Sequence, residues 1–462
     1  MSPQLSLWTL AQLQTGYLLP VWTFNGPLDI FPSDSEELLA FSTSLQRAAN
    51  RDQRFLLSER LAKRVTNWPG LFALLVHFYV LYEDTTSAID SAERLYNLAP
   101  KGTDAAFDKS WDGFMRMIRR NETRSFAELY WPEARLASPW TPIGPLNAFS
   151  WRGFDHLRAQ ALLARWQRLA GDLVERYLRY TIIESNEIEG VFHVDSATVA
   201  CLTRVGFFEN AVLHIESDSS IRRSEAIIKA LQDSSLALQS ISKTSRGELE
   251  LTVSSCCDLH QIISRQSRFS IVDIGDGPQT VALRTGALRG TYSYTTLPGD
   301  HNAIVEFAPH DELPALFENI VMTVNDILHA DSTTVPPFVL AAYLHHLFLC
   351  THPFSDGNGR LGRMVASLPL LRVQGPPLLI TNALRTSYLD ALEAVKASSD
   401  LSPLLDVFME GIEFGMDFVE SLPPLADGDA QFRGDKQAGR TMNVFPGHAG
   451  LKPEICSERI WL

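Results

Sequence analysis

The chain has 462 residues, of which 45% are hydrophobic and 20% are charged. This composition is typical of a globular protein with room for two or more domains. A formal net charge of −14 argues against nucleic acid as a main partner, because a phosphate backbone requires a basic face. The most apolar stretch, Leu71 to Tyr82, is shorter than the roughly 20 residues of a membrane helix, so we expect no membrane span.

The five cysteines are scattered, and none has the CxxC spacing of a redox or zinc site. A reducing compartment is therefore expected. The N-terminus lacks the basic and apolar regions of a secretory signal. We expect a cytoplasmic protein, with the nucleus as an alternative location.

Residues 1–131 are rich in Trp and Leu and have helical periodicity. Phe72, Leu75 and Tyr79 faintly match a tetratricopeptide helix pair, although a plain pair of helices explains them more simply. We predict a helical N-terminal region with partner binding as its candidate role. Residues 132–155 are rich in proline and predict a linker.

Apolar side chains recur at steps of three and four from Leu162 to Tyr180, which predicts one long helix within residues 156–194. Gly190 is a fitting end for this helix. Three glutamates lie in its last turns, where carboxylates oppose the helix dipole. From this segment alone, the simpler explanation is that the three carboxylates are solvated at a polar helix end. The alternative is that one of them pairs with a cation from another part of the chain. The three are Glu184, Glu187 and Glu189.

Residues 195–422 predict further helices, with His260 as a hydrogen-bonded core residue. Arg284 to Thr296 is rich in Thr and Tyr, which predicts a short extended hairpin. Val339 to Cys350 is almost wholly apolar at helical spacing and predicts a buried helix. Residues 423–462 are polar and glycine-rich without periodicity, and they predict a loosely packed tail.

A charged, glycine-rich turn at residues 352–363 follows this buried helix and precedes a second apolar run. Gly357 and Gly359 allow backbone N–H groups to converge at the start of the next helix, which is an arrangement that binds phosphate. Arg360 and Arg363 are three residues apart, so we expect them to share a helix face and clamp further phosphate oxygens.

Asp356 is the carboxylate of this turn, and its expected role is to hold a Mg²⁺ ion that bridges phosphates. His352 is placed to take a proton from an incoming hydroxyl, and Phe354 is expected to anchor the turn in the core. Together they predict attack of a hydroxyl on phosphorus. A metal site is an alternative, but the adjacent His345 and His346 point about 100° apart on a helix and cannot share one ion. A purely structural turn would not need this set of residues.

The turn fills every specified position of the motif HPFx[D/E]GNGRxxR and resembles the Fic (Fido) family. The resemblance extends over residues 180–420. It implies an all-α fold, in which a helical Fic core with a small β-hairpin flap follows the helical N-terminal region. It also implies transfer of AMP from ATP to a Ser, Thr or Tyr hydroxyl of a target protein, with release of pyrophosphate.

Carried over to this chain, the resemblance makes His352 the general base, Asp356 the Mg²⁺ ligand and Arg363 the partner of the γ-phosphate. The residues implied for the anion hole are Gly357, Asn358, Gly359 and Arg360. The target chain is expected to lie along the flap, near residues 295–309, by strand addition. ATP and the target protein are the expected partners, and a homodimer is left open.

Ser185, Glu189 and Gly190 fit the family's inhibitory pattern [S/T]xxxE[G/N]. The resemblance implies that Glu189 pairs with Arg363, denies it to the γ-phosphate and so autoinhibits the transferase. In some members the same glutamate positions water for removal of AMP, so AMP removal, or transfer of another nucleotidyl or phospho group, is an alternative. Lys396 stands where many relatives place a small amide that contacts the base of the nucleotide, so the resemblance does not specify which nucleotide is the donor. A non-catalytic nucleotide-binding scaffold is a further alternative, although the motif has lost no residue.

Overall fold

The computed structural model describes residues 51–66, 69–81, 85–98, 135–209, 211–273, 278–290, 294–297, 300–330 and 334–424. The chain divides into two compact units. Unit 1 contains Met1–Pro132 and Phe269–Leu283, and unit 2 contains Glu133–Arg268 and Arg284–Leu462. The sequence before residue 51 and the predicted tail from residue 425 lie outside the described ranges. Within those ranges, no helix combines the length and apolarity needed to cross a bilayer.

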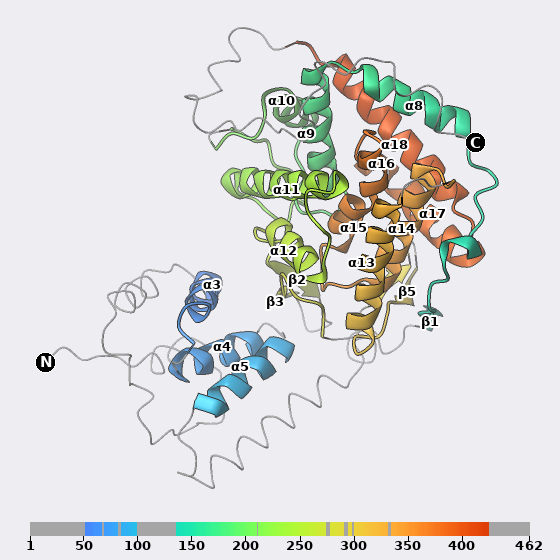
Figure 1. Ribbon diagram of the computed structural model, residues 1–462. Helices are drawn as coiled ribbons and strands as arrows, with labels where there is room; N and C mark the ends of the chain where they lie inside the picture. Colours follow the sequence, from blue (N-terminus) through green and yellow to red (C-terminus); the bar gives the residue numbers. More distant parts are fainter. Residues whose placement is uncertain are drawn as a thin grey trace, which may run out of the picture. The chain divides into compact units, whose positions relative to one another are not determined.

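The described part of unit 1 consists of helices and one hairpin (Figure 1). Its elements are α3 (Arg51–Ala62), α4 (Pro69–Leu81), α5 (Thr85–Leu98) and the antiparallel strands β2 (Phe269–Asp273) and β3 (Pro278–Ala282). The ring of Phe55 is fully buried and lies 6.1 Å from the ring of Phe269. The hairpin therefore shares the apolar core of these helices, although it lies far from them in sequence, since α5 ends at Leu98 and β2 begins at Phe269.

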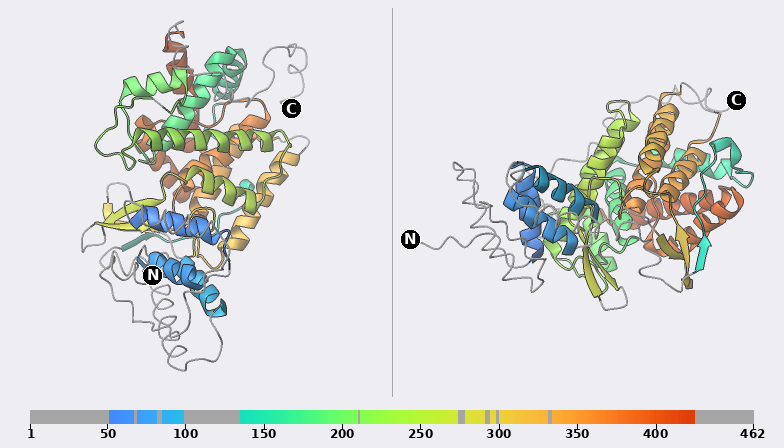
Figure 2. Two further views of the ribbon diagram at one scale, coloured as in Figure 1. Left: turned by 90° about the vertical axis from the view of Figure 1, so that its left-hand side faces the viewer. Right: turned by 90° about the horizontal axis from the view of Figure 1, so that it is seen from below.

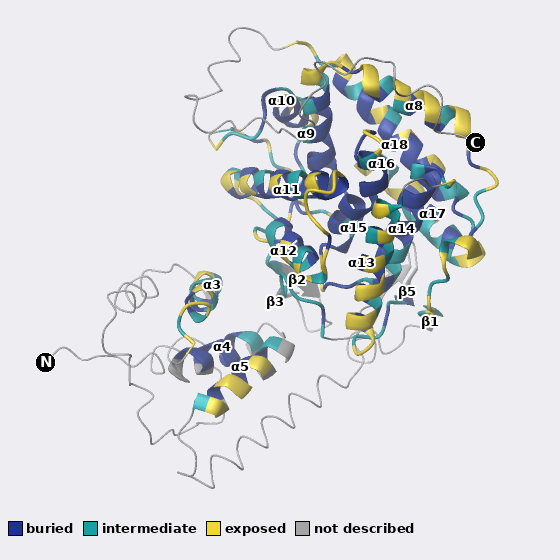
Figure 3. Cartoon of the chain, viewed as in Figure 1, coloured by how far each residue is buried: buried dark blue, intermediate teal, exposed yellow. Residues whose placement is uncertain are grey.

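Helix α14 (Pro337–Thr351) lies at the centre of unit 2. It is apolar on most of its surface, and accordingly 11 of its 15 residues are buried and none is exposed (Figure 3). Pro336 and Pro337 suit its first turn, because a proline there sacrifices no helical hydrogen bond. Its neighbours are α13 (Leu313–His329), α15 (Asn358–Ala366), α16 (Leu368–Arg372) and α18 (Ser402–Ser421).

The remaining helices surround this group (Figures 1 and 2). They are α8 (His156–Arg168), α9 (Gly171–Glu187), α10 (Ser196–Val205), α11 (Ser224–Ser245), α12 (Val253–Ile263) and α17 (Arg385–Ser398), with the short 3-10 helices η1 (Leu146–Ala148) and η2 (Asn382–Leu384). Three of them, α9, α11 and α12, contact α15. The turn before α15 is thereby placed where several helices meet.

The single long helix predicted within residues 156–194 is wrong, because the structure has two helices there. The backbone is extended at Leu169 and Ala170, with ψ of 135° and 151°, and α9 starts at Gly171. The apolar spacing of three and four continues across this break, so periodicity alone could not reveal it. Gly190 has a φ of +64° just beyond α9, which agrees with its predicted role as the helix stop.

Unit 2 also contains a three-stranded sheet in the order β1-β5-β4, as far as its residues are described. Strands β4 (Tyr294–Leu297) and β5 (Asp300–Glu306) are antiparallel and form the flap hairpin, and β1 (Arg135–Ser138) pairs with β5 in parallel. The predicted helical fold with a small β-hairpin is confirmed. However, the hairpin begins at Tyr294 and not at Arg284, because residues 284–290 turn inward and bury the side chain of Arg289.

Candidate active site

The turn between α14 and α15 is held by its own backbone and one amide side chain. His352 ends α14 in the left-handed conformation with φ 51°, and Gly357 precedes α15 with φ 74°. Asn358 Nδ2 donates to the Phe354 carbonyl at 2.7 Å, and Asn358 Oδ1 accepts from the Phe354 N–H at 2.9 Å. Phe354 is fully buried, as an anchor requires. The Asn358 side chain closes the turn, so only its backbone N–H remains for an anion.

The ring of His352 stacks on the ring of Phe307, with 3.9 Å between the ring centres. Burial, and next the nearby guanidinium of Arg289, lower the pKa of His352 to about 3. The imidazole is therefore neutral at physiological pH and able to accept a proton.

Arg289 fixes the backbone beneath His352, a role that was not predicted from the sequence. It is only 3% exposed, and its Nε donates to the carbonyl of His352 at 2.6 Å. Its Nη2 donates to the carbonyls of Thr351, at 3.1 Å, and Ala308. Its backbone N–H donates to the carbonyl of Pro353 at 3.0 Å. One arginine thus joins the end of α14 to the end of the flap.

The first turn of α15 presents the N–H groups of Asn358, Gly359 and Arg360, which have no acceptor within the helix. A Cβ atom added to Gly359 would lie 2.0 Å from Oε1 of Glu189. The Glu189 carboxylate therefore rests against this turn, where the positive end of the helix dipole favours an anion. Only glycine leaves room for it.

Arg363, one turn further along α15, is held by the segment that carries Glu189. Its Nη1 donates to Glu189 Oε1 at 2.8 Å, while its Nε and Nη2 donate to the hydroxyl and carbonyl oxygens of Ser185 at 3.1 and 2.8 Å. The side chain of Arg363 is 2% exposed and that of Glu189 is 26% exposed. The ion pair implied by the family resemblance is thus present, with its carboxylate on the accessible side.

The other two glutamates of this segment point inward. Glu184 Oε2 accepts from the N–H of Asn382 at 2.8 Å, and Glu187 Oε1 accepts from the N–H of Val194 at 3.0 Å. Burial raises the pKa of both groups, and that of Glu187 to about 7. The solvated helix end is therefore wrong for Glu184 and Glu187, which tie the segment to its neighbours.

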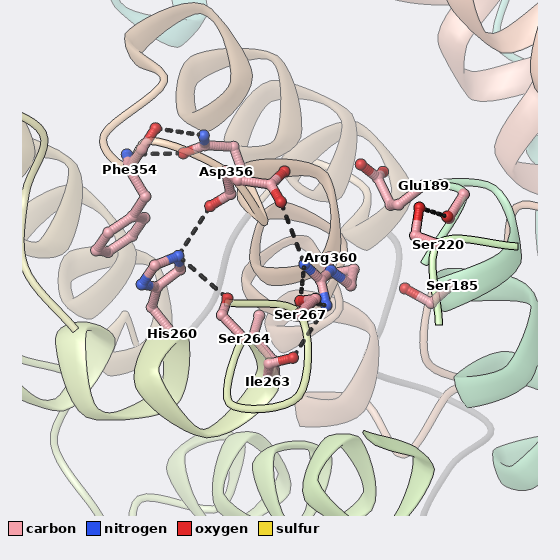
Figure 4. A network of polar contacts seen from close by, with 12 residues as sticks. Ser185, Glu189, Ser220, His260, Ile263, Ser264, Ser267, Phe354, Asp356 and Arg360 are labelled. Atoms are coloured by element: carbon pink, nitrogen blue, oxygen red, sulfur yellow. Dashed lines mark hydrogen bonds and ion pairs between the residues drawn. The ribbon is translucent and has the colours of Figure 1, made fainter. Parts of the chain in front are cut away.

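The side chain of Arg360 points to a different segment than that of Arg363. Its guanidinium is buried and donates to the carbonyl of Ile263 at 2.9 Å and to the hydroxyl of Ser267 at 3.3 Å (Figure 4). The expected shared helix face, from which Arg360 and Arg363 would both clamp phosphate oxygens, does not match this arrangement. Ile263, at the end of α12, and Ser267, beyond it, supply acceptors for the Arg360 guanidinium. Arg360 contributes its backbone N–H to the α15 turn.

His260 is a hydrogen-bonded core residue, as predicted, and it also braces the turn. Its Nδ1 accepts from the N–H of Gly286 at 2.9 Å, and its Nε2 lies 2.8 Å from the carbonyl of Asp356 (Figure 4). These partners require a neutral ring with the proton on Nε2. The ring stacks on Phe354, with 3.9 Å between centres, and burial lowers the pKa of His260 to about 4. Its partners are backbone groups that only the fold brings near, so the sequence carries no signal for this role.

The carboxylate of Asp356 has the character of a ligand for a hard cation. Its side chain is 48% exposed, and its Oδ2 lies 3.9 Å from Nη2 of Arg360. A partly exposed carboxylate beside the N–H groups of a helix N-terminus suits Mg²⁺, which prefers few protein oxygens together with phosphates and water. No group of three His, Cys, Asp or Glu side chains placed to hold a metal occurs in the described ranges.

His345 and His346 diverge, as their adjacent positions on a helix predict. Nε2 of His345 lies 2.7 Å from the hydroxyl of Tyr388, whereas His346 lies 3.7 Å from the sulfur of Cys350. Burial lowers the pKa of His345 to about 3 and that of His346 to about 4. Lys396 lies close enough to add to the effect on His346.

The Fic/DOC family model matches residues 250–370, which contain His260, Arg289 and the turn before α15. The protein adenylyltransferase fic-1 of Caenorhabditis elegans is 35% identical over 81 residues, which cover 17% of this chain and 16% of fic-1. A Fido domain-containing protein of Dictyostelium discoideum is 39% identical over 61 residues, which cover 13% of this chain and 43% of that protein. The chain thus spans about one sixth of the length of the curated adenylyltransferases that it matches.

Solved structures of Fic proteins are similar at a lower level. Residues 134–508 of C. elegans Fic-1 align with a TM-score of 0.42 and 16% identity, covering 84% of this chain and 98% of that chain. A Fic domain-containing signaling protein from Bacteroides thetaiotaomicron aligns with a TM-score of 0.43 and 20% identity, covering 58% of this chain and all of that one.

Proposed function

The chain belongs to the Fic/DOC family through residues 250–370, and from this premise we propose that it transfers AMP from ATP to a hydroxyl group of a target protein. The observation that carries the proposal is the position of the Glu189 carboxylate. It rests against the first turn of α15 and pairs with Arg363 at 2.8 Å. A protein carboxylate in this place marks a site built for anions, and the phosphates of a nucleotide are the anions that suit a helix N-terminus and a buried arginine.

In the proposed reaction, the hydroxyl oxygen of a Ser, Thr or Tyr attacks the α-phosphorus of ATP. The bond from that phosphorus to the oxygen that bridges to the β-phosphate breaks, and pyrophosphate leaves with the bonding electrons. His352 takes the hydroxyl proton on the unprotonated nitrogen of its neutral imidazole. The N–H groups of the α15 turn bind the phosphate oxygens, and Arg363 binds the γ-phosphate.

Asp356 is the residue that would hold Mg²⁺, and the ion, when bound, would neutralise charge on the phosphates. His260 holds the carbonyl of Asp356, so the carboxylate is presented by a fixed backbone. Its exposure supports this role, because a metal ligand has to reach the nucleotide from the open side of the turn.

We propose further that Glu189 keeps the activity low in the resting protein. Its carboxylate takes the space beside Gly359 and the Nη1 donor of Arg363, both of which the γ-phosphate needs. Hydrogen bonds to charged groups contribute about 1.5–3 kcal/mol each. Competition of about this size slows transfer by one to two orders of magnitude, since about 1.4 kcal/mol corresponds to a factor of ten.

The chemistry is tested with the Glu189→Gly protein and ATP labelled at either the α- or the γ-phosphate. We expect the α-label to become attached to protein and the γ-label to leave as pyrophosphate. Addition of His352→Ala should abolish the attachment while ATP binding is retained. His329→Ala, at an exposed histidine in the last turn of α13, is the matched control and should have no effect. Attachment of the γ-label, or attachment at an undiminished rate without His352, contradicts the proposal.

A further inference from the structure

The acceptors described so far for the buried guanidinium of Arg363 all belong to one segment. Its Nε and Nη2 donate to Ser185, and its Nη1 donates to Glu189, so these bonds go to α9 and the residues directly after it. In the proposed reaction, the γ-phosphate takes the place of the Glu189 carboxylate. A guanidinium has five N–H groups, so further N–H groups remain for acceptors outside this segment. Such an acceptor would keep Arg363 in place while the carboxylate leaves.

The hydroxyl of Tyr388, on α17, is an acceptor of this kind. Burial raises the pKa of the Tyr388 hydroxyl, whereas the charge of Arg363 and a hydrogen bond between the two side chains lower it. A guanidinium has only donors, so the Tyr388 oxygen is the acceptor in this contact. The proton of the Tyr388 hydroxyl therefore has to point away from the arginine.

His345, on α14, receives that proton. Its Nε2 lies 2.7 Å from the Tyr388 hydroxyl, and its side chain is fully buried. Burial, and next the charge of Arg363, lower the pKa of His345 to about 3, so the ring is neutral and one of its nitrogens can accept. Since the Tyr388 oxygen faces a cation, Nε2 is the accepting nitrogen and Nδ1 carries the hydrogen. Nδ1 lies toward α15, 3.6 Å from the position that a Cβ atom on Gly362 would take.

We propose that Tyr388 is a positioning residue for Arg363, and that His345 fixes the Tyr388 hydroxyl in the orientation that this role requires. Arg363 donates to Tyr388 and Tyr388 donates to His345, so both hydrogen bonds point away from the arginine. The inference rests on the proposed function, since Arg363 is held for the γ-phosphate of ATP. Neither Tyr388 nor His345 has to touch the nucleotide, because both act through Arg363.

The competing explanation is a purely structural pair, in which Tyr388 and His345 satisfy each other's hydrogen bonds in the core. Loss of such a pair would lower stability and would affect the binding of every nucleotide to a similar extent. A positioning role instead predicts a loss confined to nucleotides that have a γ-phosphate. The comparison of ATP with ADP therefore separates the two explanations.

The experiment measures ATP and ADP affinities by calorimetry in the full chain carrying Glu189→Gly. Tyr388→Phe removes only the hydroxyl, and we expect it to weaken ATP binding about fivefold or more and ADP binding by less than about twofold. In transfer assays, KM for ATP should rise while kcat changes less. The matched control is Tyr343→Phe, at an equally buried tyrosine of α14 whose hydroxyl donates to the Gly144 carbonyl, and it should change neither affinity.

Two variants of His345 test the second hydrogen bond. His345→Leu removes the acceptor and should reproduce the selective loss of ATP affinity, whereas His345→Gln offers an amide oxygen and should recover part of it. If His345→Leu does not fold, Tyr388→Phe decides the question. The nitrogen NMR signals of the imidazole give a readout without nucleotide, and we expect the proton on Nδ1. A proton on Nε2 would overturn the assigned orientation of the Tyr388 hydroxyl.

Equal losses of ATP and ADP affinity in Tyr388→Phe, or no loss of either, would overturn the positioning role. A selective loss that persists when Arg363→Ala is also present would do the same, because Tyr388 would then act without the arginine. If ATP affinity falls selectively but no protein is ever labelled from α-labelled ATP, AMP transfer fails as the function and the positioning role stands. If labelling proceeds with an unchanged KM in Tyr388→Phe, transfer stands and the positioning role fails.

Discussion

Glu187 and Glu189 are two residues apart and have opposite surroundings. Glu187 is buried against the N–H of Val194, and its pKa is raised to about 7, chiefly by burial and then by the charges of Glu184 and Glu216. Glu189 reaches out to Arg363. Glu187 holds the end of α9 against the following segment, and this fixed backbone places Glu189 within reach of Arg363.

The burial of Glu187 makes stability depend on pH. A carboxyl whose pKa is raised by folding stabilises the fold below its unfolded pKa, and this contribution is lost as the pH rises through about 7. Glu187→Gln has no such charge, so it should match the wild type at pH 4.5 and exceed it at pH 8.5, by up to about 3 kcal/mol. Urea unfolding at the two pH values measures the difference. A constant difference between the two pH values would show that Glu187 does not titrate in this range.

His260 is predicted to act by positioning. His260→Phe keeps a ring against Phe354 but removes the partners of the Gly286 N–H and the Asp356 carbonyl, at a cost of up to about 1–3 kcal/mol for each of these partly buried groups. We expect kcat for AMP transfer in the Glu189→Gly background to fall while KM for ATP changes less. His260→Gln, which can both donate and accept, should recover part of kcat. Equal falls for both variants would reduce His260 to a space-filling residue.

At the residue scale, the sequence predicted those parts of the candidate site that a short motif carries. The turn at residues 352–363 and its pairing with Glu189 follow from spacing and resemblance. Arg289 and His260 were not predicted as site residues, because each bonds to backbone groups that the fold brings together from distant segments. For the same reason, the sequence positions of Arg360 and Arg363 did not reveal that their side chains point to different segments.

At the scale of elements, a single added methyl group at Gly359 would fill the space in front of the N-terminus of α15. A Cβ on Gly359 falls within 2.0–3.0 Å of the Glu189 carboxylate, so that space is available to an anion only because residue 359 is glycine. Gly359→Ala in the Glu189→Gly background should therefore weaken ATP binding about tenfold or more, as measured by calorimetry. Gly171→Ala is the matched control, because it lies in the first turn of α9 with open space around its Cβ. Unchanged ATP affinity in the Gly359→Ala protein would place the phosphates elsewhere.

Helix and strand boundaries were harder to predict than the elements themselves. The break between α8 and α9 lies inside an unbroken apolar pattern. Residues 284–290 were included in the predicted hairpin, but in the structure they lie before it and bury Arg289. Strand β1 was not predicted, because four residues of a proline-rich segment form a strand only where β5 offers an edge. In each case a tertiary partner decided the local conformation.

At the scale of the whole molecule, the chain leaves unit 2 after Arg268 and returns at Arg284. The hairpin between these residues packs with the helices of unit 1, and the sequence of the predicted 195–422 core has no feature that indicates this excursion. The segment that belongs to unit 1 begins at Phe269, a few residues after the end of α12, which carries His260, and it ends at Leu283, before Gly286. The two chain segments that carry His260 and Gly286 are therefore each continuous in sequence with Phe269–Leu283 of unit 1.

The decisive quantity is the rate at which α-labelled ATP modifies the protein itself, compared between the wild type and Glu189→Gly. We predict a rise of roughly tenfold or more on removal of the carboxylate, because about 1.4 kcal/mol of competition for Arg363 is released. The rise should shrink when Arg363→Ala is present in both proteins, since removal of the carboxylate then frees only the space beside Gly359. Equal and measurable rates in the wild type and Glu189→Gly would contradict inhibition by Glu189.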